Sequence, residues 1–112
     1  MNKLNLLTVA LLMSSHSIQS VASAPHNINI ITNNWTSQIV MSNIAGNIFK
    51  DMGYQVTYQS TAISEQWGAL AYGVSDVQVE VWEGTMSDSF NRMVDDGRFV
   101  NAGEHDAKTR ED

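Results

Sequence analysis

The stretch NINIITNNWTSQIV, residues 27–40, passes from a short β-rich run into the start of a helical run. The paired asparagines between the two runs are typical of a turn, and Thr36 and Ser37 are residues that often cap helix N-termini. Apolar residues then recur at helical spacing, until Gly53 offers the left-handed conformation that ends many helices. We therefore predict a strand at 27–32 and a helix from Thr36 to the residue before Gly53.

The rest of the chain repeats this order of elements. We predict a strand at 55–58, a helix opened by Ser64 and closed by Gly73, a strand at 76–82, a turn at 83–85, a helix at 87–96 and a short strand beginning at 99–100. Each predicted helix is followed by a glycine and the connections are short. This pattern favours an α/β fold with a parallel sheet and flanking helices on both faces.

Residues 1–24 have the pattern of a secretory signal peptide, with one lysine, an apolar core at 4–13 and an Ala-Ser-Ala ending. The apolar core is shorter than the roughly 20 residues that a membrane span requires. Cleavage after Ala22 or after Ala24 fits the pattern, and export places the mature chain, about 25–112, in the periplasm. The sequence has no cysteine, which excludes a lipid-anchored lipoprotein and disulfide bonds.

The exported part is acidic, because residues 25–112 contain all 12 acidic residues and every basic residue except Lys3. This balance argues against nucleic acid and anionic membrane surfaces as partners. The histidines have no ligand spacing, so the sequence predicts no metal site and no cofactor. The tail at 103–112 is polar and not periodic, and it stops where a further element of a larger domain is expected.

Trp35 and Trp82 each follow directly after a predicted strand. Ligands of parallel sheets bind at the carboxyl ends of strands, so we expect both indoles at one mouth. An indole face can bind a quaternary cation, and the N–H groups of a helix start can bind a carboxylate. Thr36, Ser37 and Thr85 are the helix-start residues beside the two tryptophans. An alternative also stays open, since large aromatic side chains are mostly buried and both indoles could simply pack in the core.

Two further features point away from catalysis. Trp67 lies in the apolar stripe of a predicted helix, which favours packing against the sheet. Glu80 and Glu83 flank Trp82, and alternation along 76–82 places Glu80 on the same side as Trp82. A hydrolase requires two carboxylates that face each other across a substrate, which this spacing does not fix. We therefore predict a protein that is not an enzyme.

Several short motifs together resemble one family. They are NWTSQ at 34–38, MGY at 52–54, QWGAL at 66–70, QVEVWEGT at 78–85, NR at 91–92, NAG at 101–103 and HDAKTR at 105–110. In this order they resemble the periplasmic substrate-binding proteins of ABC importers for glycine betaine, proline betaine, choline and related quaternary amines. The resemblance covers about residues 28–111.

The resemblance implies a two-lobed, type II periplasmic binding protein fold that closes on its ligand and delivers it to an ABC permease in the inner membrane. It implies a monomer whose quaternary amine ligand is held in an aromatic box. Trp35 and Trp82 match two walls of that box. The residues that follow them match positions that contact the ligand carboxylate or hydroxyl in related proteins: Thr36, Ser37, Glu83 and Gly84.

The chain is much shorter than these proteins, so it corresponds to the N-terminal part of the first lobe, without the second. A cation–π contact contributes about 0.5–2 kcal/mol, whereas micromolar binding requires about 8 kcal/mol. Two indoles and a helix start therefore predict an affinity no better than about millimolar. The alternatives are a small exported structural or interaction protein and a truncated remnant that binds no ligand.

Overall fold

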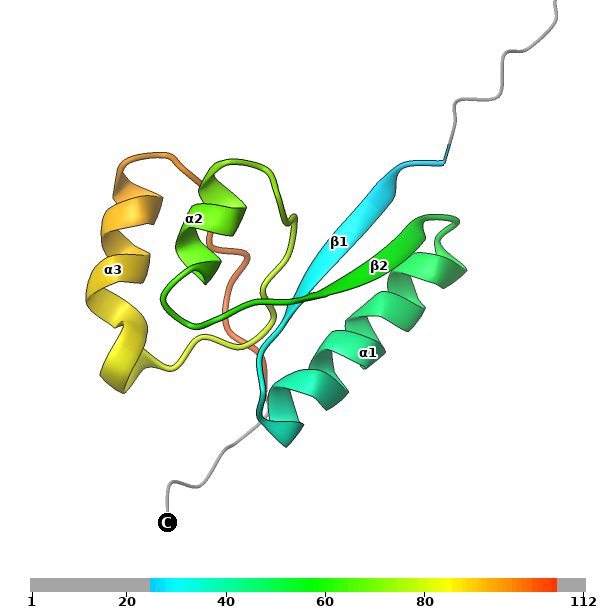
Figure 1. Cartoon of the computed structure of the whole chain (residues 1–112), viewed down its shortest axis with the longest axis horizontal. Helices are drawn as coiled ribbons and strands as arrows, with labels where there is room; N and C mark the ends of the chain where they lie inside the picture. Colours follow the sequence, from blue (N-terminus) through cyan, green and yellow to red (C-terminus); the bar gives the residue numbers. More distant parts are fainter. Residues whose placement is uncertain (1–24, 107–112) are drawn as a thin grey trace, which may run out of the picture.

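The computed structural model describes residues 25–106, including every side chain in that range except that of Glu83. The elements, shown in Figure 1, are β1 (Asn27–Thr32), α1 (Thr36–Asp51), β2 (Gln55–Ser60), α2 (Gln66–Ala71) and α3 (Glu83–Asp95). Two parallel strands are flanked by helices, which confirms the predicted α/β class. Within residues 25–106, no helix is long and apolar enough to cross a bilayer.

The sheet is centred on β1. β1 and β2 are parallel, in a register that pairs Asn27 with Gln55 and Thr32 with Ser60. Ile30 and Ile31 of β1 are completely buried and form the centre of the core. α1 packs against both strands, whereas α2 and α3 pack together on the opposite side of the strands in Figure 1.

The predicted strand at 76–82 is wrong for most of its length. Val77 forms a single parallel bridge with Ile30, and its carbonyl accepts a hydrogen bond from the Ile31 amide at 2.9 Å. Residues 78–82 belong to no strand, and the sheet within residues 25–106 consists of β1 and β2. The Gln78 and Glu80 side chains instead hydrogen-bond to residues of α1, α2 and the end of β1.

The helix ends agree with the prediction better than the helix starts. Gly53, Gly73 and Gly97 have φ angles of 94°, 70° and 67°, which confirms that they end the three helices. α2 begins after Glu65, so Ser64 is not its N-cap. α3 begins at Glu83, four residues before the predicted start, so the predicted turn at 83–85 is the first turn of the helix.

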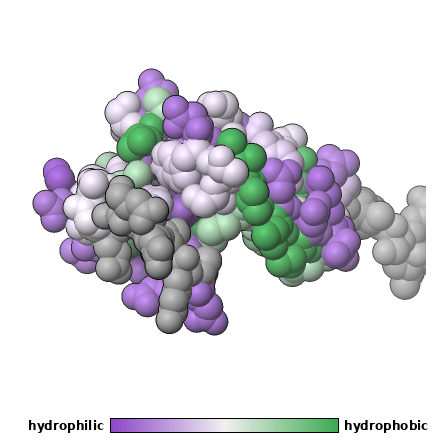
Figure 2. Space-filling view, turned by 90° about the horizontal axis from the view of Figure 1, so that it is seen from below, coloured by the Kyte–Doolittle hydropathy of each residue, from purple (hydrophilic) through white to green (hydrophobic). Residues whose placement is uncertain are grey.

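The two faces of α1 have an unexpected character. The buried residues on the sheet side are Gln38, Ser42 and Gly46. The apolar residues that predict the helix lie mainly on its outer face, where Val40, Ile44, Ile48 and Met52 are 51–64% exposed. Figure 2 shows a ridge of hydrophobic residues on this side of the molecule.

Small side chains on the inner face let α1 approach the strands closely. A Cβ atom at Gly46 would overlap the hydroxyl of Tyr58 on β2 and lie 2.9 Å from Cζ of that ring. The Ser42 hydroxyl and the Gln38 amide also donate hydrogen bonds to the Ile31 carbonyl, at 3.1 and 2.7 Å. The helix therefore contacts the sheet through polar and small groups, which leaves its apolar residues outside.

An amide network joins α1, α2 and the end of β1. Gln78 accepts a hydrogen bond from Gln38 at 2.9 Å, and it donates to Gln66 at 2.6 Å and to Asn33 at 2.9 Å. Gln38 and Gln66 are completely buried, and Asn33 is 5% exposed. Buried amides require partners of this kind because an unpaired polar group is costly in the interior.

Trp67 lies in a separate aromatic cluster. Its ring centroid is 5.6 Å from that of Phe90 in α3 and 5.6 Å from that of Phe99, and it is 7% exposed. Its indole N–H donates to the Ser89 hydroxyl at 2.9 Å. The predicted packing role is thus confirmed, although the partners belong to α3 and the segment after it rather than to the sheet. Phe99 belongs to this cluster, and the predicted strand at 99–100 is wrong.

Candidate functional site

Trp35 and Trp82 occupy equivalent places in the fold. Trp35 is the N-cap of α1 and Trp82 is the N-cap of α3, and both have extended backbone conformations. Neither helix start has a side-chain cap hydrogen bond. The predicted position of each indole at a helix start is confirmed, whereas Thr36 and Ser37 are the first two helical residues and not the cap.

The Glu80 carboxylate links Trp35 to the segment that leads into Trp82. It accepts a hydrogen bond from the Trp35 indole N–H at 2.8 Å and another from the Ser37 hydroxyl at 2.9 Å. Glu80 is only 3% exposed, while both indoles are half-buried. Both donors are neutral groups, and between them they engage both oxygens of the Glu80 side chain.

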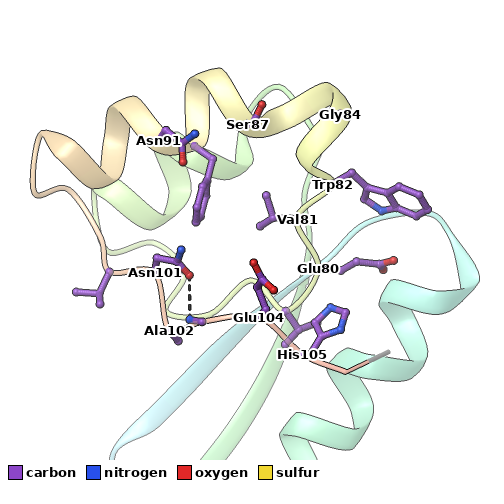
Figure 3. Close-up of a pocket in the computed structure, with 14 residues that line it drawn as sticks. Glu80, Val81, Trp82, Gly84, Ser87, Asn91, Asn101, Ala102, Glu104 and His105 are labelled. Carbon is purple, nitrogen blue, oxygen red and sulfur yellow. Dashed lines mark hydrogen bonds between the residues drawn. The ribbon is translucent and has the colours of Figure 1, made fainter. Parts of the chain in front are cut away.

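A hollow of about 930 Å³ lies between the start of α3 and the segment at 100–105. Glu80, Trp82, Gly84 and Ser87 line it on one side (Figure 3). Glu104 and His105 line it on the other side. The Trp82 indole lies at its edge, and the Glu80 carboxylate points toward the start of α1. The hollow is therefore lined by acidic and neutral polar side chains, with an indole at its edge.

The structure brings together only part of the predicted site. Trp82 and Gly84 line the hollow, whereas Trp35, Thr36 and Ser37 do not. Among the aromatic pairs of the described residues, Trp35 and Trp82 make no ring–ring contact. The backbone of Glu83 opens α3. The candidate site therefore consists of two indole-bearing helix starts, the first of which is hydrogen-bonded to Glu80.

Glu80 is the residue whose role the sequence interpretation missed. The sequence suggests it only as one member of a catalytic pair with Glu83, yet both of its carboxylate oxygens accept hydrogen bonds from α1 residues. The one available signal was alternation, which places Glu80 beside Trp82 on the same side of the segment. The partner Trp35 is 45 residues away in the chain, and no local pattern indicates that contact.

A second hollow of about 680 Å³ lies at the carboxyl ends of β1 and β2, lined by Asn33, Asn34 and residues 60–64. The segments that follow the two strands line it, and neither tryptophan borders it. The hollow beside Trp82 is therefore the better candidate for recognition of a cation.

Comparison with known proteins identifies relatives. The family model OpuAC, the substrate binding domain of ABC-type glycine betaine transport systems, matches residues 26–112. The chain is 36% identical over 115 aligned residues to the trimethylamine N-oxide-binding protein of Pelagibacter ubique (strain HTCC1062). That alignment covers all of this chain but 37% of the relative, so the chain spans little more than a third of its length. No solved structure matches the chain significantly.

These matches confirm the resemblance drawn from the sequence motifs. The parallel strands with flanking helices agree with part of one lobe of the type II periplasmic binding protein fold. The matched region begins at residue 26 and includes both tryptophans, Glu80 and the hollow beside α3. The chain therefore belongs to the family of substrate-binding domains of ABC-type glycine betaine transport systems.

Proposed function

We propose that this chain is the N-terminal part of the solute-binding component of an ABC importer, and that it binds glycine betaine or a related amine with a trimethylammonium group. The equivalent placement of Trp35 and Trp82 at the N-caps of α1 and α3 carries this proposal. It offers two indoles for a cation beside two helix starts that no side chain caps. The family match supports the same ligand class.

The ligand class follows from shared chemistry. Glycine betaine and trimethylamine N-oxide, which give the family and the relative their names, both carry three methyl groups on a positively charged nitrogen. Such a nitrogen cannot donate a hydrogen bond, so an indole face is the natural contact. Trp35 and Trp82 supply those faces in this proposal. Thr36, Ser37, Glu83 and Gly84 supply the surrounding helix-start groups.

The proposed cellular role completes the assignment. Residues 1–24 act as a signal peptide that is cleaved on export, and the mature chain is a periplasmic monomer that presents its ligand to an inner-membrane permease. The chain spans little more than a third of the length of the trimethylamine N-oxide-binding protein that it matches. Binding by the two indoles alone is expected to be weak, about millimolar, because each cation–π contact contributes only about 0.5–2 kcal/mol.

The test is a titration of the chain purified from the periplasm after export. Glycine betaine and trimethylamine N-oxide are added into the millimolar range while tryptophan emission is followed, with glycine as the control that lacks the methyl groups. We expect a saturable change with the two methylated compounds only. A folded chain that responds equally to glycine, or to none of the three, would contradict the proposed function.

A variant assigns the signal to the site. Trp82→Ala is expected to abolish the betaine response while leaving the unfolding midpoint close to that of the unmodified chain, because Trp82 is half-buried at the edge of a hollow. Betaine binding of unchanged strength in this variant would exclude Trp82 from the site.

A second candidate function is a non-transport interaction protein, and the exposed apolar face of α1 favours it. In that case the tryptophans only pack, and methylated amines leave the emission unchanged. Quenching by acrylamide separates the two functions, because site tryptophans in an open lobe are accessible to the quencher.

A further inference from the structure

We infer that Glu80 is a positioning residue, which holds the Trp35 indole in one orientation for contact with a trimethylammonium group. The inference rests on the proposed function, because it takes Trp35 as one wall of the cation site. It assigns Glu80 a role through Trp35, not a contact with the ligand.

The hydrogen bond from Trp35 determines how the indole can turn. An indole has a single donor, its ring N–H, and here that donor is engaged by Glu80 Oε2 at 2.8 Å. Hydrogen bonds to a carboxylate are shorter and about twice as strong as those between neutral groups. Rotation of the half-buried ring about its side-chain bonds would break this bond. The acceptor therefore selects one ring orientation in the free protein.

The acceptor itself is fixed from several directions. Glu80 is 3% exposed, and its other carboxylate oxygen accepts the Ser37 hydroxyl of α1 at 2.9 Å. Its chain segment is attached to β1 through the Val77 bridge and to α1 and α2 through the Gln78 amide. Because Glu80 is itself fixed, it can fix the Trp35 side chain in turn. Preorganised binding sites require supporting residues of this kind.

Preorganisation matters more for this site than for a closed cage. Ordering one side chain on binding costs up to about a tenfold loss of affinity. A site with two indoles has few contacts from which to recover such a loss. A fixed Trp35 avoids the loss, so Glu80 strengthens binding without contacting the amine.

The test compares two substitutions in the exported chain. Glu80→Ala removes the acceptor, whereas Glu80→Gln keeps an oxygen for Trp35 and an amide donor for the Ser37 hydroxyl. Indole N–H resonances are recorded by ¹H–¹⁵N NMR, and glycine betaine is titrated. For Glu80→Ala we expect a shifted Trp35 resonance and about tenfold weaker binding, while Glu80→Gln stays within about threefold of the unmodified chain.

Ser89→Ala is the matched control. It removes the acceptor of the Trp67 indole, which makes a hydrogen bond of nearly the same length, 2.9 Å, within the aromatic cluster. We expect the Trp67 resonance to shift and the betaine affinity to remain unchanged. A loss of binding in this control equal to that in Glu80→Ala would show a general effect of structure and overturn the inference.

The outcomes separate this inference from the proposed function. Suppose that the unmodified chain binds betaine and that Glu80→Ala, with an unchanged Trp67 resonance, binds it equally well. This result overturns the positioning role alone. If Glu80→Ala does not fold, Glu80→Gln provides the test. An unchanged Trp35 resonance with tenfold weaker betaine binding would show that the Glu80 charge acts directly on the ligand. That result also overturns the positioning role. No betaine binding by the unmodified chain contradicts the proposed function itself.

Discussion

The regions around Trp67 and Trp35 use the same side chain in opposite ways. Both indoles donate a hydrogen bond of similar length, 2.9 Å to the Ser89 hydroxyl and 2.8 Å to the Glu80 carboxylate. Trp67 is buried against two phenyl rings, whereas Trp35 is half-buried at the start of a helix. The indole hydrogen bond alone therefore does not distinguish a core tryptophan from a candidate site tryptophan. The chemical type of the acceptor and the side chains that surround the ring distinguish them.

The largest expected difference between the two regions is in stability. Trp67→Ala should lower the free energy of unfolding by about 3–5 kcal/mol, because it empties the centre of an aromatic cluster. Trp35→Ala should lower it by less than about 2 kcal/mol, because that side chain already contacts solvent. Urea unfolding followed by circular dichroism measures both. Equal losses would mean that Trp35 is a core residue and would remove the contrast.

The segment that joins the two regions is expected to have an intermediate effect. Gln78→Leu leaves the buried amide groups of Gln38, Gln66 and Asn33 with fewer partners, which should cost about 1–3 kcal/mol. The exposed Gln55 at the start of β2 provides the control, since Gln55→Leu should change the free energy by less than about 0.5 kcal/mol. Comparable urea midpoints for the two variants would contradict a structural role for the network.

The smallest expected effect refines the comparison. Trp67→Phe keeps an aromatic ring but removes the donor to Ser89, and it should cost about 1 kcal/mol. It also removes the most buried of the three indoles, so the emission that remains comes from Trp35 and Trp82. Acrylamide should quench this emission more strongly than that of the unmodified chain. Weaker quenching would show that Trp35 and Trp82 are better shielded than Trp67.

Local patterns predicted the elements whose structure depends on local interactions. β1, α1 and the glycines that end the three helices are where the sequence places them. The strand at 76–82 failed because strand formation requires neighbours, and only Ile30 pairs with Val77. The start of α3 failed because Gly84 and Thr85 are also common in turns. Helical periodicity predicted α1, but it did not show that Gln38, Ser42 and Gly46 would form the buried face.

The candidate site divides in the same way. The change from strand-like to helix-like sequence placed Trp35 and Trp82 at helix starts, because that change is visible over a few residues. The contact of Trp35 with Glu80 spans 45 residues, and it depends on how the 77–82 segment leaves β1. No spacing rule contains that information.

The amide network has a consequence for the conditions that the protein can tolerate. Amide groups neither gain nor lose protons over the pH range in which proteins are handled, and they carry no net charge for salt to screen. The connection of α1 and α2 to β1 through Gln38, Gln66 and Gln78 should therefore keep its strength in acid and in concentrated electrolyte. A joint built from ion pairs would weaken under both conditions, so the contact between these helices and β1 should be lost later than a salt-bridged contact as acid or salt is added.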